Sequence, residues 1–558
     1  MTIWETLDAI ERTDRGLIFV DRRERETRLE WVQLRQEARC VAASLQRKGV
    51  LPGERVALVY RTEPDFFRAF FGCLYAGAVP TPLYPPVRLG RLESYHQRTA
   101  NMLTSADAVL VLASASIRKL LGRSIREAKP RHGCITLEQL GKSSPIEAPR
   151  TSALGLVQFS SGTTSQPKPV ALSHRALLVQ GRIILDQLAE SFPESRASHS
   201  GVSWLPLYHD MGLIGCVIPA MIHSTDLVLI RPEDFIGRPA LWLRALSRHK
   251  AIISPAPNFA YGLCAQRIRD EELDGVDLSS WRVALNGAEA VQEHTLRSFS
   301  NRFSKFGFRE EAMTPVYGLS EAALAVCFSD FKAPRKTHQL EDGTTHISLG
   351  APLPGFEVAI RDSQGSSVGE GESGRIWIRG PSLMEGYLNQ PEATAEILVD
   401  GWLNTGDVGC LFGGELSVIG RAKDLIILNG KNHSPATIEA SIVDLNGLRD
   451  GCVAAVGVPH ADSERLVLLV EHASQATPAA IEQLGPLCTQ RILEDHSLQA
   501  ETVVLRPGTL PRTSSGKIRR RAALTHLLND SLLPPESMGP LKLLSALWDS
   551  RRSMPRTP

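Results

Sequence analysis

The chain has 558 residues, and at the usual ~100–200 residues per domain it predicts several domains or subdomains built around more than one core. Its 43% hydrophobic and 22% charged residues are typical of a folded protein, so the composition excludes intrinsic disorder and a membrane bundle. The 62 basic and 61 acidic residues leave a net charge of +1, which excludes a wholesale basic surface and gives no sign of a nucleic-acid partner.

The cysteines and the apolar segments indicate where the protein works. The nine cysteines are scattered and contain no CxxC pair, which favours buried thiols over disulfides or structural zinc. The first eight residues show neither a basic leader nor the apolar core of a signal peptide. The most apolar window, 211–222, is shorter than the ~20 residues needed to span a bilayer. We therefore expect a cytoplasmic protein with no membrane span.

Apolar runs alternate with amphipathic stretches along the first part of the chain, which predicts an α/β fold with buried strands. Strands are expected at 55–60 and 108–113. Between them, Thr62 is a candidate helix cap with Pro64 in the first turn. A strand at 154–158 precedes a polar loop, and a helix capped by Ser173 should follow.

From about residue 420 the pattern continues on a smaller scale. Strands are expected at 424–428, 453–458 and 465–470, with a helix beginning at Ser434 and Pro435. We predict a large N-terminal domain of packed α/β subdomains over 1–422 and a small α+β domain over 423–529. Residues 530–558 are expected to form a tail or linker.

The strongest local motif is the loop at 160–168, with the sequence SSGTTSQPK. Small hydroxyl residues and glycine let backbone N–H groups approach phosphate oxygens closely, so this loop is a candidate anion cradle. On composition alone, a solvated Ser/Thr loop is the commoner outcome. The loop does not match GxxxxGK[ST], which excludes the P-loop NTPase interpretation.

Further motifs follow this loop in order: WLPLYHDMGLIG (204–215), PAPNFAYG (255–262), LNGAE (285–289), YGLSEA (317–322), NTGD (404–407), GRAKD (420–424), GKNHSP (430–435) and LPRTSSGK (510–517). Together they resemble the adenylate-forming ligases, the superfamily of acyl-CoA synthetases, peptide-synthetase adenylation domains and luciferase. Within it the chain is most similar to the fatty acyl-AMP ligases. The resemblance extends from LYAGAVP at 74–80 to Lys517, and it implies a mobile C-terminal domain.

The resemblance implies that a carboxylate attacks the α-phosphate of ATP, releasing pyrophosphate and leaving an acyl-adenylate. It assigns ATP binding to Ser160, Ser161, Gly162, Thr163, Thr164, Lys168, Asn286, Gly287, Ala288, Glu289, Tyr317, Gly318, Ser320, Asp407 and Arg421. Ser165 and Pro169 depart from the family's usual glycines, and Pro169 removes a backbone donor. Judged from the residues alone, Asp407 is as readily an ordinary turn residue.

The same resemblance assigns the chemistry to a few side chains. Lys517 would reach the α-phosphate and the attacking carboxylate, where a cation stabilises charge that builds in the transition state. Glu321 would hold Mg²⁺, with Thr163 as a second ligand. His209 would line the passage to the acyl pocket, and Lys423 falls at the hinge. Without the family context, these are ordinary surface charges and a core histidine.

The acyl pocket is expected to include Met211, Phe259 and Tyr261, although such residues are more often plain core. A pocket that buries about ten methylenes at ~0.8 kcal/mol each would bind a medium or long acyl chain. The implied acceptor is the phosphopantetheine thiol of an acyl carrier protein supplied in trans. Free CoA is the alternative acceptor, and a non-catalytic adenylate-binding or acyl-binding protein is the third hypothesis.

Overall fold

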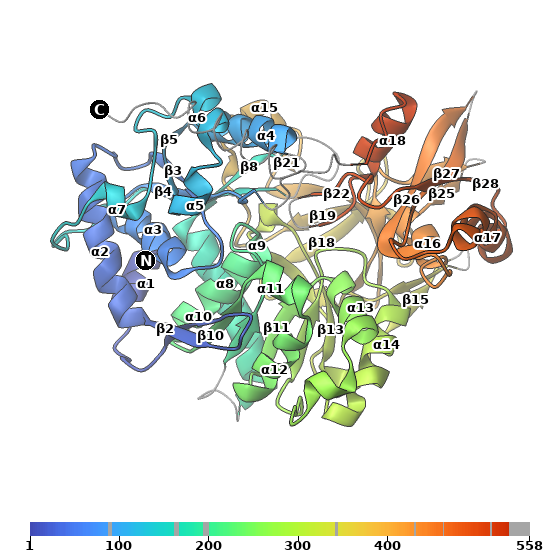
Figure 1. Ribbon diagram of the computed structural model, residues 1–558, viewed down its shortest axis with the longest axis horizontal. Helices are drawn as coiled ribbons and strands as arrows, with labels where there is room; N and C mark the ends of the chain where they lie inside the picture. Colours follow the sequence, from blue (N-terminus) through green and yellow to red (C-terminus); the bar gives the residue numbers. More distant parts are fainter. Residues whose placement is uncertain are drawn as a thin grey trace.

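The structure is a computed structural model that describes residues 1–86, 92–160, 167–193, 200–340, 344–428, 431–460, 463–513 and 516–534. It has a large N-terminal domain and a smaller C-terminal domain, and helices cover mixed parallel and antiparallel sheets (Figure 1). The predicted α/β fold with two unequal domains is confirmed.

The largest sheet of the described residues has nine strands in the order β17-β14-β13-β12-β11-β9-β10-β1-β2. Its strands are β1 (Gly16–Val20), β2 (Glu26–Glu30), β9 (Gly201–Ser203), β10 (Leu227–Ile230), β11 (Ile253–Ala256), β12 (Val283–Asn286), β13 (Met313–Gly318), β14 (Ala325–Phe328) and β17 (Ala351–Pro352). Neighbours from β13 to β1 run parallel, and the outer pairs are antiparallel. The carboxyl ends of β11, β12 and β13 therefore meet at one edge, where α/β sheets usually bind ligands.

Helices follow the strands of this sheet, as parallel connections require. They are α8 (His174–Ser191), α9 (Asp210–Gly212), the π-helical turn η3 (Leu213–Val217), α10 (Ile218–Ile222), α11 (Pro232–Gly237), α12 (Ala240–Arg248), α13 (Asn258–Arg267) and α14 (Glu293–Phe303), with short turns η4 (Asp270–Leu273), η5 (Ser304–Phe306), η6 (Glu310–Ala312) and η7 (Ser320–Ala322). Ser173 caps α8 as predicted, because its Oγ accepts the Ala176 N–H at 3.2 Å.

A second sheet, β4-β3-β5-β6, is wholly parallel, and a third, β20-β8-β7, is antiparallel. Their strands are β3 (Arg55–Val59), β4 (Val79–Pro82), β5 (Ala108–Ala113), β6 (Cys134–Ile135), β7 (Leu154–Phe159), β8 (Pro169–Ser173) and β20 (Gly386–Tyr387). The helices beside them are α1 (Ile3–Asp8), α2 (Trp31–Arg47), α3 (Pro64–Tyr75), α4 (Leu92–Ser105), α5 (Ala115–Arg118), α6 (Gly122–Ala128) and α7 (Leu137–Leu140).

Two details of the prediction change in this region. Thr62 does not cap α3, because the N-cap is Glu63, which is extended as a residue before proline prefers and makes no side-chain cap bond. The polar loop does not lead directly into α8, because β8 lies between them. Pro169 is the first residue of β8, a position that tolerates a residue without an N–H.

The rest of the large domain is an antiparallel sheet, β18-β19-β22-β21, with β23 also paired to β22. Its strands and the nearby elements are β18 (Glu357–Arg361), β19 (Gly374–Arg379), β21 (Leu398–Val399), β22 (Trp402–Phe412), β23 (Glu415–Arg421), the hairpin β15 (Thr337–Gln339) and β16 (Thr345–Ile347), and α15 (Pro391–Ala395). β22 and β23 place Asp407 opposite Arg421.

The C-terminal domain has its own sheet and hydrophobic cores. Its elements are the hairpin β24 (Ile426–Leu428) and β25 (Lys431–His433), the sheet of β26 (Leu448–His460), β27 (Ser463–His472) and β28 (Ala500–Leu505), and helices α16 (Pro435–Ala440), α17 (Pro478–His496) and α18 (Arg520–Leu528). Figure 1 shows them gathered at one side of the molecule. The boundaries at 422/423 and 529/530 stay predictions, and residues 535–558 of the expected tail lie outside the described residues.

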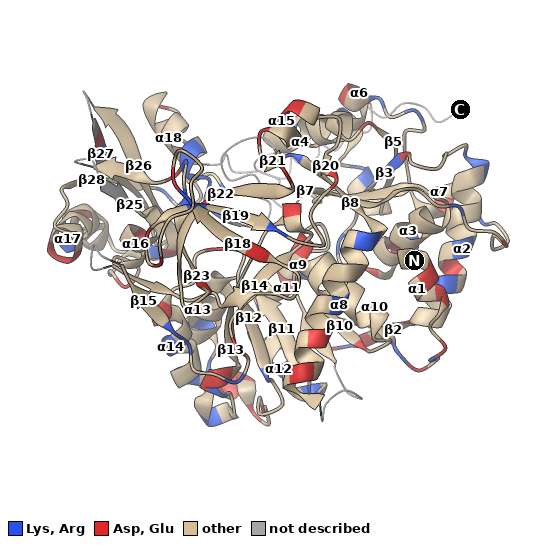
Figure 2. Ribbon diagram, turned by 180° about the vertical axis from the view of Figure 1, so that it is seen from behind, with Lys and Arg blue, Asp and Glu red and all other residues tan. Residues whose placement is uncertain are grey.

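The surface and the cysteines agree with the composition. Acidic and basic residues are interspersed over the fold rather than collected on one face (Figure 2). All nine cysteines are free, and all except Cys40 are buried. Within the described part of the chain, no helix has both the length and the apolar character needed to cross a membrane.

Candidate active site

A cavity of about 280 Å³ brings together side chains from both domains. Pro255, Leu285 and Val316 line it from the ends of β11, β12 and β13. The predicted site residues that also line it are Ser160, Lys168, His209, Met211, Ala288, Tyr317, Gly318, Ser320, Glu321, Arg421, Lys423 and Lys517. Ser161, Gly162, Thr163 and Thr164 lie outside the described residues.

A larger cleft of about 1260 Å³ adjoins this cavity between the two domains. The two spaces share lining residues that include Tyr317, Arg421 and Lys517. Phe259, Glu289 and Asp407 line the cleft but not the cavity. The small domain therefore contributes to a space that is continuous with the cavity.

Asp407 lies between an aromatic hydroxyl and a guanidinium. Tyr317 Oη donates to Asp407 Oδ2 at 2.7 Å, and Arg421 Nε contacts Asp407 Oδ1 at 2.8 Å. Arg421 also donates to the Thr405 carbonyl at 3.0 Å. The Asp407 charge raises the pKa of Arg421 further, and burial together with Asp407 raises the pKa of Tyr317. This end of the site is a fixed set of donors and acceptors suited to a sugar and a phosphate.

His209 is anchored by Asp210, a residue that sequence reasoning did not select. His209 Nδ1 lies 2.6 Å from Asp210 Oδ1, which also accepts the Met211 N–H at 2.7 Å. Ser320 Oγ donates to the other carboxylate oxygen. Burial would raise the pKa of Asp210, but these contacts outweigh it and hold that pKa well below its usual range. A buried carboxylate therefore fixes the imidazole that lines the cavity.

Glu321 and Lys168 both contact Tyr387, a second residue absent from the sequence prediction. Tyr387 Oη donates to Glu321 Oε1 at 2.8 Å, and Lys168 Nζ lies 4.4 Å from the centre of the Tyr387 ring. Lys168 is held in turn at the loop's end, because its N–H donates to Ser160 Oγ at 3.0 Å. The tyrosine thus sets the spacing between an acid and a base in the cavity.

Lys517 is half-buried and lines both the cavity and the larger cleft. Burial lowers the pKa of its ammonium group, and the charges of Glu289 and Asp210 partly oppose that effect. Its N–H donates to Thr513 Oγ1 at 3.0 Å, and its carbonyl accepts the Thr513 N–H at 2.8 Å. An ammonium group is therefore carried from the small domain into the cavity, as the sequence prediction requires.

The segment after β12 has several roles. Asn286 is fully buried, and its Nδ2 donates to Asn258 Oδ1 at 3.2 Å, so it secures the strand end rather than lining either space. A Cβ on Gly287 would lie 2.7 Å from Val316 Cγ2, so only glycine fits here. Glu289 Oε1 accepts the Phe259 N–H at 2.5 Å, and burial raises the pKa of its carboxyl.

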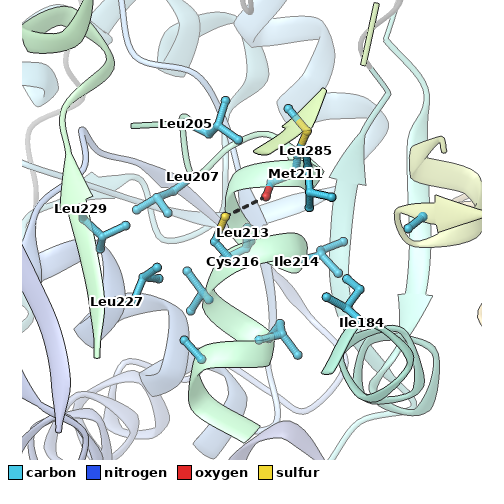
Figure 3. Close-up of a cluster of buried hydrophobic side chains, with 14 of the residues drawn as sticks. Ile184, Leu205, Leu207, Met211, Leu213, Ile214, Cys216, Leu227, Leu229 and Leu285 are labelled. Carbon is cyan, nitrogen blue, oxygen red and sulfur yellow. Dashed lines mark hydrogen bonds between the residues drawn. The ribbon is translucent and has the colours of Figure 1, made fainter. Parts of the chain in front are cut away.

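The other end of the cavity is apolar. Ile184, Met211, Gly215, Leu324 and Phe328 line it. Figure 3 shows the helical segment after Asp210 with Leu227 and Leu229 of β10 on one side and Ile184 on the other. Sequence reasoning placed Met211 here but missed the others, because Ile184, Leu324 and Phe328 lie on separate elements.

A π-helical turn shapes this apolar end. Pro219 has no N–H to donate to the Gly215 carbonyl, and the helix widens over Leu213–Val217. Cys216 Sγ donates to the Met211 carbonyl at 3.3 Å, as Figure 3 shows. Tyr261, expected in the acyl pocket, lies instead in an aromatic core with Trp242, and its Oη donates to the Leu285 carbonyl. Phe259 faces the larger cleft.

No group of three or more His, Cys, Asp or Glu in the described residues could hold a metal by itself. Glu321 is the acid that lines the cavity beside Lys168 and Tyr387. One carboxylate is enough for Mg²⁺ when substrate phosphates and water supply the other ligands. The residues present therefore fit a magnesium ion that arrives with a nucleotide.

Residues 8–388 match the AMP-binding enzyme family, and residues 423–534 match the AMP domain of the Disco-interacting protein 2-like family. The chain belongs to the AMP-binding enzyme family. The adenylate-forming resemblance predicted from the motifs is thereby confirmed.

Among its curated relatives is a Caulobacter vibrioides protein assigned provisionally as an acyl-CoA synthetase, which is 33% identical and aligns over 94% of this chain and 95% of its own. Another is the medium-chain-fatty-acid–[acyl-carrier-protein] ligase JamA of Moorena producens, at 33% identity with 92% of each chain covered. The solved structures include one from studies of fatty acyl-adenylate ligases of E. coli and L. pneumophila, with a TM-score of 0.88, 31% identity and coverage of 95% of this chain and 98% of that chain. This AMP-binding enzyme is thus similar to fatty acyl-AMP ligases over nearly its whole length.

Proposed function

We propose that this enzyme uses ATP to convert a medium- or long-chain fatty acid into an acyl-adenylate and then passes the acyl group to the phosphopantetheine thiol of an acyl carrier protein. The observation that carries the proposal is the composition of one cavity. Its polar part holds Lys517, Glu321 and Arg421, and its other part is lined by apolar side chains. A molecule with a charged phosphate and a greasy tail fits such a space.

In this proposal Lys517 stabilises the transition state. When the fatty carboxylate attacks the α-phosphorus, negative charge accumulates on the phosphate oxygens and on the departing pyrophosphate. Burial lowers the pKa of Lys517, and the anionic phosphates of a bound nucleotide would favour its charged form. A preplaced cation in a water-excluded site lowers the barrier without comparable ground-state binding.

The remaining polar residues would bind the nucleotide. Asp407 would accept hydrogen bonds from the ribose hydroxyls, and Tyr317 would lie beside the adenine. Arg421, Lys168 and the hydroxyl-rich loop would neutralise the phosphates. The full set proposed is Ser160, Ser161, Gly162, Thr163, Thr164, Lys168, Gly287, Ala288, Glu289, Tyr317, Gly318, Ser320, Asp407 and Arg421. Asn286 would support this set from behind, by securing the end of β12 through its bond to Asn258.

We also propose that Glu321, with Thr163, would hold Mg²⁺ beside the phosphates. The metal would supply positive charge to phosphate oxygens. Tyr387 supports this role of Glu321 because it donates to Oε1 at 2.8 Å and so orients the carboxylate. His209, fixed by Asp210, would line the passage between the nucleotide and the acyl chain.

The proposed acyl site is the apolar end of the cavity, and the proposed acceptor route is the larger cleft. Lys423 lines the cavity at the proposed boundary between the domains, where a rotation would carry Lys517 away before the thiol enters. Free CoA is the competing acceptor, because one relative is named as an acyl-CoA synthetase and another as an acyl-carrier-protein ligase. The free thiols fit a reducing compartment, so a cytoplasmic location stays part of the proposal.

The decisive variant is Lys517→Ala. The barrier to fatty-acid-dependent pyrophosphate release should rise by at least ~3 kcal/mol, so the rate should fall about a hundredfold, by analogy with a lost oxyanion donor. Lys305→Ala, which removes an exposed lysine of the large domain, is the matched control and should retain the wild-type rate. An unchanged rate in Lys517→Ala would refute the catalytic assignment.

The acceptor is tested separately, starting from a synthetic acyl-adenylate. The enzyme is offered free CoA in one reaction and a carrier protein bearing phosphopantetheine in another. The proposal expects thioester formation on the carrier. Efficient formation of acyl-CoA with no carrier loading would replace the acceptor in the proposal and leave the first half-reaction intact.

A further inference from the structure

Glu471 is a fully buried carboxylate that the chemistry proposed above does not use. It lies on β27 in the core of the C-terminal domain, where an acidic side chain is rare unless it has partners. Its Oε2 accepts from Arg449 Nη1 at 2.7 Å and from the Gly508 N–H at 2.8 Å. Its Oε1 accepts the Leu510 N–H at 2.7 Å. Both oxygens therefore hold backbone groups of one short segment.

That segment is the turn by which the chain leaves the sheet. β28 ends at Leu505, which pairs with Glu471 across the parallel ladder. The turn closes where Thr509 Oγ1 donates to the Arg506 carbonyl at 2.8 Å, and Gly508 takes a φ of +86°, which favours glycine. Beyond the end of the β27–β28 ladder, the Glu471 carboxylate accepts the N–H groups of Gly508 and Leu510, which would otherwise need a strand partner.

The chain then enters the hairpin that carries Lys517. The Arg519 N–H donates to the Pro511 carbonyl at 2.9 Å, and Thr513 pairs with Lys517 in both directions. Leu510, at the base of this hairpin, is fully buried. Arg512 ties the hairpin itself to β26 by donating to the Gly451 carbonyl at 2.6 Å, and Glu471 attaches the turn that precedes it. The position of the Lys517 backbone therefore depends in part on where Glu471 holds this turn.

We propose that Glu471 is a positioning residue for Lys517: its carboxylate fixes the base of the hairpin so that the amine reaches the cavity in the reactive position. The inference rests on the proposed function, because it concerns the lysine that acts in adenylation. Displacing a catalytic group by about 1 Å can slow a reaction on the order of a hundredfold. Glutamine cannot replace the carboxylate, because it has one acceptor oxygen and its NH₂ would face an N–H donor.

The competing explanation is that Glu471 only stabilises the small domain. The two roles differ in what they predict for an enzyme that already lacks the amine. A positioning residue has nothing left to position when Lys517 is alanine. Replacing a residue that matters only for the fold or for binding should slow K517A by the same factor as it slows the wild type.

The test measures fatty-acid-dependent pyrophosphate release for the wild type, E471Q, K517A and the double variant. We expect E471Q to lower kcat roughly tenfold to a hundredfold and to change the KM for ATP by less than about twofold. The double variant should match K517A within about twofold. The control is E501Q, which removes an exposed carboxylate on the neighbouring strand β28 that pairs with Arg465, and it should behave as the wild type.

The inference would be overturned if E471Q kept the wild-type kcat. It would also be overturned if E471Q slowed K517A by the same factor by which it slows the wild type. If K517A itself keeps the wild-type rate, the proposed function fails first, which separates the two failures. If E471Q shows no cooperative thermal unfolding, E471D, which keeps the charge but withdraws it by one methylene, is measured by the same criteria.

Discussion

Gly215 lines the apolar part of the cavity, so replacing it by valine should shorten the acids that the enzyme accepts. A Cβ placed on Gly215 would lie 2.6 Å from Leu324 Cδ2, and both residues line the cavity with Ile184 and Phe328. The valine side chain would take the space of two to three methylenes of a bound chain. At ~0.8 kcal/mol per buried methylene this is roughly 2 kcal/mol, or about thirtyfold in kcat/KM.

The loss should fall only on acids long enough to reach that end. The assay is pyrophosphate release over a series of saturated acids of increasing length, for the wild type and for Gly215→Val. Gly485→Val is the matched control, because Gly485 lies on α17 of the C-terminal domain and lines neither the cavity nor the cleft, and a Cβ there would lie at an ordinary 3.7 Å from Val504 of β28. Equal losses for short and long acids would refute the placement of the acyl chain.

Two further predictions use contacts away from the acyl end. Burial lowers the pKa of His174 to about 4, and its Nδ1 accepts the Ile3 N–H at 3.2 Å. The unfolded chain therefore binds a proton at His174 below about pH 6.5, whereas the folded chain does so only below about pH 4. The free energy of unfolding should therefore decrease by up to about 3 kcal/mol across this range, and urea titrations of His174→Gln should show a smaller decrease; the same slope in both would refute the assignment. Asp407→Asn removes the carboxylate that holds Arg421, and losing a charge-assisted bond to ribose should raise the KM for ATP roughly tenfold or more, whereas an unchanged KM would exclude Asp407 from the nucleotide site.

Much of the fold could be predicted because its signals are local. The strand at 108–113 coincides with β5, and Ser173 caps α8 through a bond within one turn. The errors arise where two local preferences compete. Thr62 is a good cap by residue type, but Pro64 already sets the start of α3, so the cap falls on Glu63.

The candidate site was predictable only where a motif carried it. Lys517 and Glu321 stand in motifs, and the structure brings both to one cavity. Tyr387 acts on Glu321, 66 residues away in sequence, so no spacing could indicate it. Asp210 stands beside His209 in the motif at 204–215, but its bond from Ser320, 110 residues away, could not be read from that motif. The expected place of Tyr261 in the acyl pocket was not met for a related reason. An aromatic residue in such a motif packs equally well in the core behind the pocket, where Tyr261 donates to the Leu285 carbonyl.

The most direct test of the account follows one oxygen atom. A fatty acid labelled with ¹⁸O in its carboxylate is incubated with ATP, Mg²⁺ and the acceptor thiol, and the products are analysed by mass spectrometry. If the carboxylate attacks the α-phosphorus, the oxygen stays on that phosphorus when the thioester forms, so AMP should carry one ¹⁸O atom. Unlabelled AMP with ¹⁸O in inorganic phosphate, or ADP in place of AMP, would contradict adenylation.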